Sequence, residues 1–264
     1  MDQKKITDTP AVVLAGGLGT RLRRVLPSIP KPLAKVGCKP FLQLLIHQLV
    51  NQGIRHVIIC TGHLANQIDR EIGDGSAWGA RIEYSREDMQ LGTAGALKLA
   101  GRLLTNYPHF LAMNGDSFLE ADFGRLIRFH RAHCGIASIA VHPVDDVGRY
   151  GAVEADSRGM ATAFTDQSGR SGPGLINAGV YAFNHNVLRQ IPEGPASLER
   201  DVFPRILEEG VYILEHRGMF IDIGVPKDYA RAQTLSDTLW NLASQQYPLS
   251  TDGAVEVHRC SIPA

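Results

Sequence analysis

Apolar and polar residues alternate along the first half of the chain in blocks that switch repeatedly between strand-like and helix-like spacing. Short apolar runs bounded by turn residues predict strands at 11–15, 57–60, 82–84 and 109–113. Between these runs, apolar residues recur three and four positions apart, which predicts helices at 41–52, 64–72, 93–104 and 122–133. Gly53 fits the end of the first helix, and Thr93 fits the N-cap of the third. This rhythm predicts a parallel sheet with helices on both faces.

From about residue 134 onward, strand-like segments follow one another with little helix between them. They lie at 136–141, 151–154, 160–165 and 174–183, and Gly- and Ser-rich segments separate them. Helical patterns return at 198–209 and 227–244, and 245–264 has weak patterning. We therefore expect an α/β fold with a mixed, mostly parallel sheet and a small antiparallel layer over one end. It forms one three-layer αβα domain over 1–235, with a C-terminal helix and tail at 236–264 packed on it.

The composition is that of a globular protein with a sizeable core. Hydrophobic residues make up 44% of the 264 residues, and 27 Lys and Arg balance 27 Asp and Glu, which disfavours disorder and binding to bulk nucleic acid or acidic membranes. The four cysteines show no metal-site or redox-motif spacing: Cys38, Cys60, Cys134 and Cys260. Cys60 ends an apolar run and is expected to be a small buried residue. The N-terminal residues do not have the pattern of a signal peptide, and no apolar run approaches the ~18 residues that a membrane span needs. We therefore expect a cytoplasmic protein.

The balanced total hides an uneven distribution of charge. The first 40 residues carry eight Lys or Arg and two Asp or Glu. Within them, the segment Leu14-Ala-Gly-Gly-Leu-Gly-Thr-Arg-Leu22 directly follows the first predicted strand. Ligands of open α/β sheets bind beyond the carboxyl ends of strands, and glycines let backbone N–H groups approach a phosphate closely. The segment is neither a Walker A loop nor a dinucleotide-binding fingerprint, because Leu22 stands where the third glycine would fall. A plain tight turn is the alternative.

The twenty residues from Arg21 onward contain six cations and no acid. Lys31 lies between Pro30 and Pro32, so its backbone is stiff and poorly suited to a helix. An arginine fork at Arg21 and a braced lysine at Lys31 suit a clamp for a polyphosphate. A solvated basic loop is the alternative, and it fits the other four cations better: Arg23, Arg24, Lys35 and Lys39.

Two aspartates are candidates for a metal site. Asp116 follows the apolar strand at 109–113, so it is expected at a carboxyl end of the sheet. Asp222 lies within a strand-like run at 219–223, where an unpaired acid would be costly. Two carboxylates that converge near a triphosphate would hold Mg²⁺, which prefers oxygen ligands. The alternatives are a helix or turn cap for Asp116 and a helix-entry cap before Pro226 for Asp222.

These segments together resemble the nucleoside-triphosphate:sugar-1-phosphate nucleotidyltransferases. The motifs occur in the family's order and cover residues 10–235: 14–22, 30–33, 91–95 (Leu-Gly-Thr-Ala-Gly), 114–116 (Asn-Gly-Asp), 177–181 (Asn-Ala-Gly-Val-Tyr) and 221–226 (Ile-Asp-Ile-Gly-Val-Pro). Within the family, the short chain looks most like bacterial guanylyltransferases of D-glycero-D-manno-heptose 1-phosphate. The resemblance implies a Rossmann-like nucleotidyltransferase domain whose antiparallel layer binds the sugar. Relatives are often dimers or tetramers, so a homodimer is one expectation.

The resemblance also implies roles for individual residues. Catalysis is assigned to Arg21 and Lys31, and Mg²⁺ to Asp116 and Asp222. The nucleotide would contact Leu14, Ala15, Gly16, Gly17, Gly19, Thr20, Glu87, Gly92 and Thr93. The sugar would contact Asn114, Gly151, Asp166 and Asn177, with Tyr150 beside them.

The implied reaction joins GTP, or another NTP, to a sugar 1-phosphate. An oxygen of the sugar phosphate attacks the α-phosphorus in line, and pyrophosphate leaves, which gives GDP-heptose for surface polysaccharide synthesis. No protein nucleophile is required, so catalysis rests on positioning and charge stabilisation.

Glu87 is the residue that bears on the choice of base. Many thymidylyl- and uridylyltransferases of the family carry Gln at the matching position. A carboxylate only accepts hydrogen bonds and can take both N1–H and N2–H of guanine, so Glu87 favours GTP. The alternatives are UTP or dTTP with another sugar 1-phosphate, and a plain surface acid beside Arg86.

One departure from the family concerns the sugar phosphate. Many relatives carry Glu-Lys after the strand at 160–165, and that lysine contacts the sugar phosphate. Here Asp166 can stand for the acid, but Gln167 cannot supply the charge. Arg170 and Arg149 are candidates for the missing cation, although Asp166 and Arg170 also fit a solvated loop.

Two other classes of protein compete with the enzyme. A non-catalytic nucleotide-sugar binding subunit would not need to retain Arg21, Lys31 and both aspartates. A glycosyltransferase that uses nucleotide-sugars usually shows Asp-x-Asp after a strand, and Asn114-Gly-Asp-Ser117 lacks it.

Overall fold

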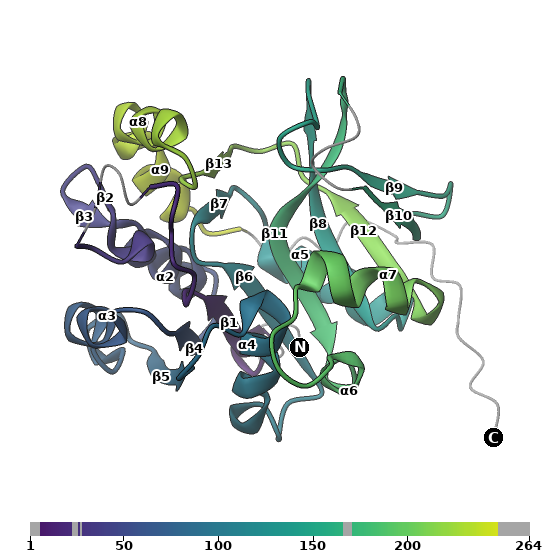
Figure 1. Ribbon diagram of the computed structural model, residues 1–264, viewed down its shortest axis with the longest axis horizontal. Coiled ribbons are helices and arrows are strands. Elements are labelled where there is room, and N and C mark those ends of the chain that lie inside the picture. The colour runs from purple at the N-terminus through teal and green to yellow at the C-terminus, as the bar shows by residue number, and fades with distance from the viewer. Residues whose placement is uncertain (1–5, 23–25, 27, 166–170, 248–264) are drawn as a thin grey trace.

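Seven strands form the central sheet of the protein. The computed structural model describes residues 6–22, 26, 28–165 and 171–247. The strands of the sheet are β1 (Ala11–Leu14), β4 (His56–Thr61), β5 (Arg81–Arg86), β6 (His109–Asn114), β8 (Ala137–Val144), β11 (Gly174–Asn184) and β12 (Val211–Glu215). Their order is β12-β8-β11-β6-β1-β4-β5 (Figure 1). Neighbours are parallel except where β11 pairs with β6 and β8, which confirms the predicted mixed, mostly parallel sheet.

Helices cover both faces of the sheet because its strands are apolar on both sides. In β1, Ala11 and Val13 belong to one buried cluster, and Val12 belongs to another together with Ile58. The first cluster takes residues from α2 (Phe41–Asn51), α3 (Ala65–Ile72), α5 (Phe123–His133), α8 (Pro226–Thr234) and α9 (Ser236–Ala243). The second takes residues from α4 (Gly92–Ala100), α6 (Val187–Gln190) and α7 (Phe203–Ile206). The predicted three-layer αβα architecture is confirmed.

Short antiparallel pairs flank the main sheet. These are β2 (Lys35–Val36) with β3 (Lys39–Pro40), β7 (Ser117–Leu119) with β13 (Phe220–Asp222), and β9 (Val153–Ala155) with β10 (Ala161–Phe164). The β9–β10 pair is the predicted small antiparallel layer, and it packs beside α7, where Phe164 stacks on Phe203 (Figure 1). The β7–β13 pair brings two distant segments of the chain into contact.

Both helices expected in the last third of the chain are broken. The segment 227–244 forms α8 and α9, which meet at Leu235, and the Thr234 hydroxyl beside it donates to the carbonyl of Arg231. The segment 198–209 forms a π-helical turn (Leu198–Val202), α7 and a 3₁₀ turn (Leu207–Glu209). Pro204 lacks an N–H group there and cannot continue a regular helical ladder.

Two local expectations were wrong, and one strand of the main sheet was missed, as were the short strands β2, β3 and β7. Thr93 is not the N-cap of α4, since Leu91 occupies that position and Thr93 lies in the first turn. Lys31 does not avoid helical structure: it begins a 3₁₀ turn over Lys31–Leu33, which tolerates proline in its first positions. The strand β12 follows Gly210 at the edge of the sheet, where it pairs with β8.

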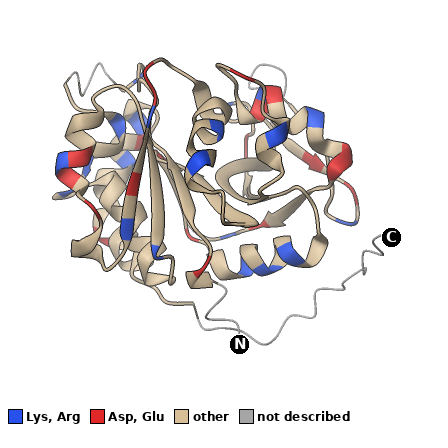
Figure 2. Ribbon diagram, turned by 90° about the horizontal axis from the view of Figure 1, so that it is seen from below, with Lys and Arg blue, Asp and Glu red and all other residues tan. Residues whose placement is uncertain are grey.

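Several of the outer helices carry both basic and acidic positions, coloured blue and red (Figure 2). Within the described residues, no helix is long and apolar enough to cross a membrane. Cys60 is buried in the second cluster, as expected. The boundary at 235 stays a prediction, although α9 packs against α2, and 248–264 lie outside the described residues.

Candidate active site

Two neighbouring cavities open at the carboxyl ends of the central strands. The first, the β1 cavity, measures about 300 Å³ and is bordered by the loop after β1, the start of α4 and the loop after β6. The second, the β11 cavity, measures about 640 Å³ and lies between β11, the β9–β10 pair, the 198–202 turn and β13. Asn114, at the end of β6, borders both cavities.

The β1 cavity gathers every residue that the sequence assigned to the nucleotide. They are Leu14, Ala15, Gly16, Gly17, Gly19, Thr20, Glu87, Gly92 and Thr93. Arg21, Lys31 and Asp116, assigned to catalysis and metal binding, border the same cavity. The structure therefore brings these residues together, and their individual roles stay predictions.

The loop after β1 packs tightly on Lys31. Gly19 has a left-handed backbone (φ 58°), and a Cβ there would lie 3.0 Å from Cβ of Lys31. The 3₁₀ turn fixes Lys31 from the other side, with the Ala34 amide donating to the Lys31 carbonyl at 3.0 Å. The lysine side chain is 12% exposed, and its ammonium group pairs with the carboxylate of Asp116. Lys31 is thus held at the edge of the β1 cavity.

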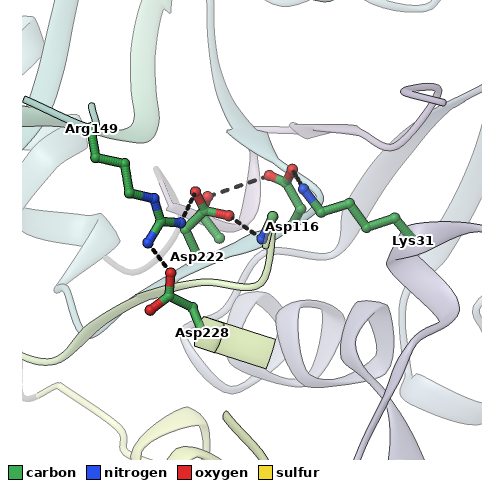
Figure 3. A network of polar contacts seen from close by, with 7 residues as sticks. Lys31, Asp116, Arg149, Asp222 and Asp228 are labelled. Atoms are coloured by element: carbon green, nitrogen blue, oxygen red, sulfur yellow. Dashed lines mark hydrogen bonds and ion pairs between the residues drawn. The ribbon is translucent and has the colours of Figure 1, made fainter. Parts of the chain in front are cut away.

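The β7–β13 pair brings the two candidate metal ligands together (Figure 3). Asp222 stands opposite Ser117 in this ladder, and the Ile223 amide donates to the carbonyl of Asp116 at 3.0 Å. The Ser117 hydroxyl donates to the Asp116 carboxylate at 3.3 Å. Asp116 borders the β1 cavity and Asp222 the β11 cavity, so the carboxylate pair lies across the boundary between them.

Asp222 is not the cap of the helix that follows it. Its Oδ1 accepts a hydrogen bond of 2.5 Å from the Gly224 amide, while the N-cap of α8 is Val225. Burial and the nearby charge of Asp116 raise the pKa of Asp222, and Lys31 and Arg149 partly offset this. A Cβ at Gly224 would lie 2.7 Å from Oδ1 of Asp222 and 3.0 Å from Nζ of Lys31, so a side chain there would have to displace these two groups.

The donor set of Asp116 and Asp222 fits Mg²⁺. Two carboxylates side by side repel one another, and a divalent cation between them relieves that repulsion. In the described part of the chain, no group of three or more His, Cys, Asp or Glu could hold a metal. A site of two carboxylates suits Mg²⁺, because this ion keeps several waters and takes phosphate oxygens as further ligands.

Glu87 points into the β1 cavity from the segment after β5. Its Oε2 accepts a hydrogen bond of 3.2 Å from the Leu91 amide. Its Oε1 packs on two glycines, since a Cβ would lie 2.7 Å away at Gly16 and 2.6 Å away at Gly62. Burial raises the pKa of Glu87. Arg86 pairs with Asp69 instead, so Glu87 is not a surface acid beside Arg86.

The β11 cavity holds three of the four residues assigned to the sugar: Asn114, Gly151 and Asn177. The fourth, Asp166, and the candidate cation Arg170 lie outside the described residues, as does Gln167. Asn177 is fixed by its own hydrogen bonds, accepting from the Gly179 amide and donating to the Tyr181 hydroxyl, both at 2.9 Å. Tyr150 borders the cavity as well.

Glu199 is a polar residue of the site that the sequence did not reveal. Three hydroxyl groups donate to its carboxylate: Tyr181 at 3.2 Å, Thr93 at 3.2 Å and Ser197 at 2.8 Å. Thr93 borders the β1 cavity and Ser197 the β11 cavity, so Glu199 links the two walls. The local pattern around 197–200 predicts only the start of a helix.

The two arginines near the β11 cavity differ in their contacts. Arg149 pairs with Asp228 and with Asp222 and lies over the ring of Tyr150. Arg200, which the sequence did not single out, borders the β11 cavity and is exposed. Its guanidinium forms no ion pair with another described residue, so it is free to bind an oxygen-rich ligand.

The chain matches a family model described as "Nucleotidyl transferase" over residues 10–238. It is 36% identical over 243 residues to the mannose-1-phosphate guanylyltransferase catalytic subunit beta of Drosophila pseudoobscura pseudoobscura, covering 91% of this chain and 65% of that protein. It is 37% identical over 226 residues to the mannose-1-phosphate guanylyltransferase of Mycobacterium tuberculosis, covering 84% of this chain and 62% of that protein. The chain thus spans less than two thirds of the length of these relatives.

A solved structure resembles the chain over nearly its own full length. This is HddC from Yersinia pseudotuberculosis, complexed with GMP-PN. The two proteins are 32% identical in sequence, and their structures match with a TM-score of 0.77. The match covers 86% of this chain and 98% of HddC.

Proposed function

The chain belongs to the nucleotidyl transferase family, and from that premise we propose that it transfers GMP from GTP to a sugar 1-phosphate. The products are a GDP-sugar and pyrophosphate. The names of the sequence relatives, mannose-1-phosphate guanylyltransferases, support both the reaction and the base. The complex of HddC with GMP-PN supports a guanine nucleotide as the ligand.

The observation that carries the proposal is the position of the carboxylate pair. Asp116 borders the β1 cavity, Asp222 borders the β11 cavity, and Asn114 is shared. A nucleotide in the first cavity and a sugar 1-phosphate in the second would have their phosphates meet at these carboxylates. Such a meeting point is what an in-line transfer between two phosphates requires.

The chain's own groups would position the reactants and stabilise charge. An oxygen of the sugar 1-phosphate forms the new bond to the α-phosphorus, the bond to the β-phosphate oxygen breaks, and pyrophosphate carries away the electron pair. Backbone amides of the loop after β1, with Arg21 and Lys31, would hold the triphosphate oxygens. When bound by Asp116 and Asp222, Mg²⁺ would supply further positive charge at these oxygens.

We propose D-glycero-D-manno-heptose 1-phosphate as the sugar substrate, for a surface polysaccharide. The β11 cavity has about twice the volume of the β1 cavity, and the unpaired Arg200 offers donors to a hydroxyl-rich sugar. Mannose 1-phosphate is the second candidate, because the sequence relatives are named for it. The cytoplasm is the proposed compartment, and a homodimer stays a prediction.

The test is a matrix of GTP, UTP and dTTP against heptose, mannose and glucose 1-phosphates, read by pyrophosphate release with Mg²⁺. We expect the highest kcat/KM for GTP with the heptose phosphate. A preference for mannose 1-phosphate would correct the sugar. A preference for UTP or dTTP would contradict the role of Glu87, and no release with any pair would favour a non-catalytic binding subunit.

A further inference from the structure

Arg149 lies at the point where three distant segments of the chain meet. It belongs to the loop between β8 and β9, and its guanidinium lies between Asp222 of β13 and Asp228 of α8 (Figure 3). One amino group donates to Asp228, and the other lies 3.4 Å from Oδ2 of Asp222. The side chain of Asp228 is 13% exposed, so this contact is largely withdrawn from solvent.

The face of the guanidinium is covered as well. Its central carbon lies 4.7 Å from the centroid of the Tyr150 ring. Tyr150 packs edge-on against Phe220, with 5.8 Å between the centroids. Two ion pairs and a stacked ring leave Arg149 few directions in which to move, so it differs from the unpaired Arg200.

These contacts fix both oxygens of Asp222. Oδ1 is held by the Gly224 amide and Oδ2 by Arg149. Arg149 is itself held by Asp228, which lies in the first turn of α8. Groups that bond to a metal-binding carboxylate set its orientation, and their removal typically costs about 10–100-fold in metal affinity.

We propose that Arg149 is a positioning residue that acts through Asp222, holding this carboxylate in the orientation that binds a divalent cation, with Asp228 as its anchor. The proposal rests on the proposed function in one respect, the assignment of the cation to Asp116 and Asp222. It excludes the role that the sequence suggested for Arg149, that of a direct ligand of the sugar phosphate.

A positioning role and a purely electrostatic role of Arg149 predict opposite changes in cation affinity when this residue is removed. Arg149 is a positive charge beside the carboxylate, so its removal should tighten cation binding if charge alone mattered. If Arg149 fixes the geometry, its removal weakens binding. Lysine keeps the charge but lacks the planar fork that bridges two carboxylates, so Arg149→Lys should weaken binding too, though less.

The test is the binding of Mn²⁺ alone to the full chain, followed by the EPR signal of the free ion without nucleotide or sugar. We expect affinity to fall about 10–100-fold in Arg149→Met, by less in Arg149→Lys and Asp228→Asn, and to be lost in Asp222→Asn. Arg128→Met is the matched control, because Arg128 also pairs with an aspartate at 3.4 Å and its side chain is 29% exposed against 33% for Arg149. Circular dichroism checks that each variant is folded.

Unchanged or tighter Mn²⁺ binding in folded Arg149→Met would overturn the proposal, as would a wild-type chain that binds no Mn²⁺. A rise in the KM for sugar 1-phosphate without any change in Mn²⁺ affinity would identify Arg149 as a sugar-phosphate ligand instead. The proposed function is judged separately by pyrophosphate release. If the wild type transfers no nucleotide but the Mn²⁺ series holds, the proposed function fails and the positioning role stands.

Discussion

The β1 cavity and the β11 cavity are built in different ways. The β1 cavity is the smaller one, and glycines and backbone form much of its border, with Asp116 at one edge and Glu87 packed against Gly16 and Gly62. The β11 cavity is about twice as large and bordered by amide, hydroxyl, aromatic and charged side chains. Backbone groups suit phosphates, which are the same in every nucleotide. Side chains suit a sugar whose hydroxyl pattern must be distinguished from that of others.

The boundary between the cavities is the most constrained part of the site. The β7–β13 ladder sets Asp116 beside Asp222. The carboxylate of Glu199 accepts hydrogen bonds from hydroxyl groups in the walls of both cavities. The difference between the cavities therefore yields separable effects: changes at the boundary should affect the reaction, changes in the β1 cavity the base, and changes in the β11 cavity the sugar.

The largest expected effect is at the boundary. Asp116→Asn keeps the size of the side chain but removes the charge that faces both Lys31 and the proposed cation. We expect kcat/KM for pyrophosphate release to fall roughly a thousandfold, the upper end of the loss seen when one group that stabilises transition-state charge is removed, with the fold retained by circular dichroism. Asp145→Asn, at an exposed position outside both cavities, is the control. Activity near that of the wild type in Asp116→Asn would show that the reaction does not depend on the carboxylate pair at the boundary.

The next effect concerns the β1 cavity alone. Glu87→Gln replaces an acceptor by a group that both donates and accepts, so it loses the match to N1–H and N2–H of guanine. We expect the ratio of kcat/KM for GTP over UTP to fall by about 10–100-fold, the value of a hydrogen bond to a charged group. The KM for sugar 1-phosphate should not change. An unaltered GTP/UTP ratio would sink the base-reading role.

A smaller effect is expected in the β11 cavity. Arg200→Met removes the unpaired guanidinium, and we expect the KM for sugar 1-phosphate to rise about tenfold while the KM for GTP stays constant. Arg200→Lys should restore part of the loss. Arg205→Met, one turn further on and exposed outside the cavity, should behave as the wild type. Equal rises in both KM values would show that the two cavities are not separable.

The smallest effect is a pH dependence of base selectivity. Because burial raises the pKa of Glu87, this carboxyl takes up a proton at a higher pH than an ordinary glutamate. The preference for GTP over UTP should be fully present above that pKa and decline as the pH falls through it, since the protonated form has lost acceptor capacity. The ratio of the two kcat/KM values over a pH series measures this. The ratio in Glu87→Gln should be flat, and a flat ratio in the wild type would argue against an ionised Glu87 at the base.

The two cavities also differ in how well their residues can be predicted from the sequence alone. The residues of the β1 cavity lie mostly in two continuous motifs, 14–22 and 87–93, each next to a strand end, so their meeting could be predicted. The alternating apolar runs likewise predicted the sheet and its two helical layers. The β11 cavity draws residues from segments as far apart as Asn114 and Asp222, and local patterns do not say which of them meet. Glu199 and Arg200 look like any residues at the start of a helix.

Local backbone detail was the least predictable part of the fold. Threonine is a residue type that favours the N-cap position. The Thr93 hydroxyl instead donates to Glu199 and accepts from the Leu198 amide, contacts that only the tertiary fold provides. Lys31 lies between two prolines and still forms a 3₁₀ turn, because proline is tolerated where the amide needs no partner. The break between α8 and α9 falls at Leu235, inside a continuous helical pattern of apolar residues that gives no sign of it.

The most direct test of the central claim is a crystal structure of the chain with a GDP-sugar product and Mg²⁺. We expect guanine beside Glu87 and Gly16 in the β1 cavity, the sugar beside Asn177 and Arg200 in the β11 cavity, and a metal ion bound by both Asp116 and Asp222. Guanine in the β11 cavity, or a metal ion that contacts neither aspartate, would contradict it.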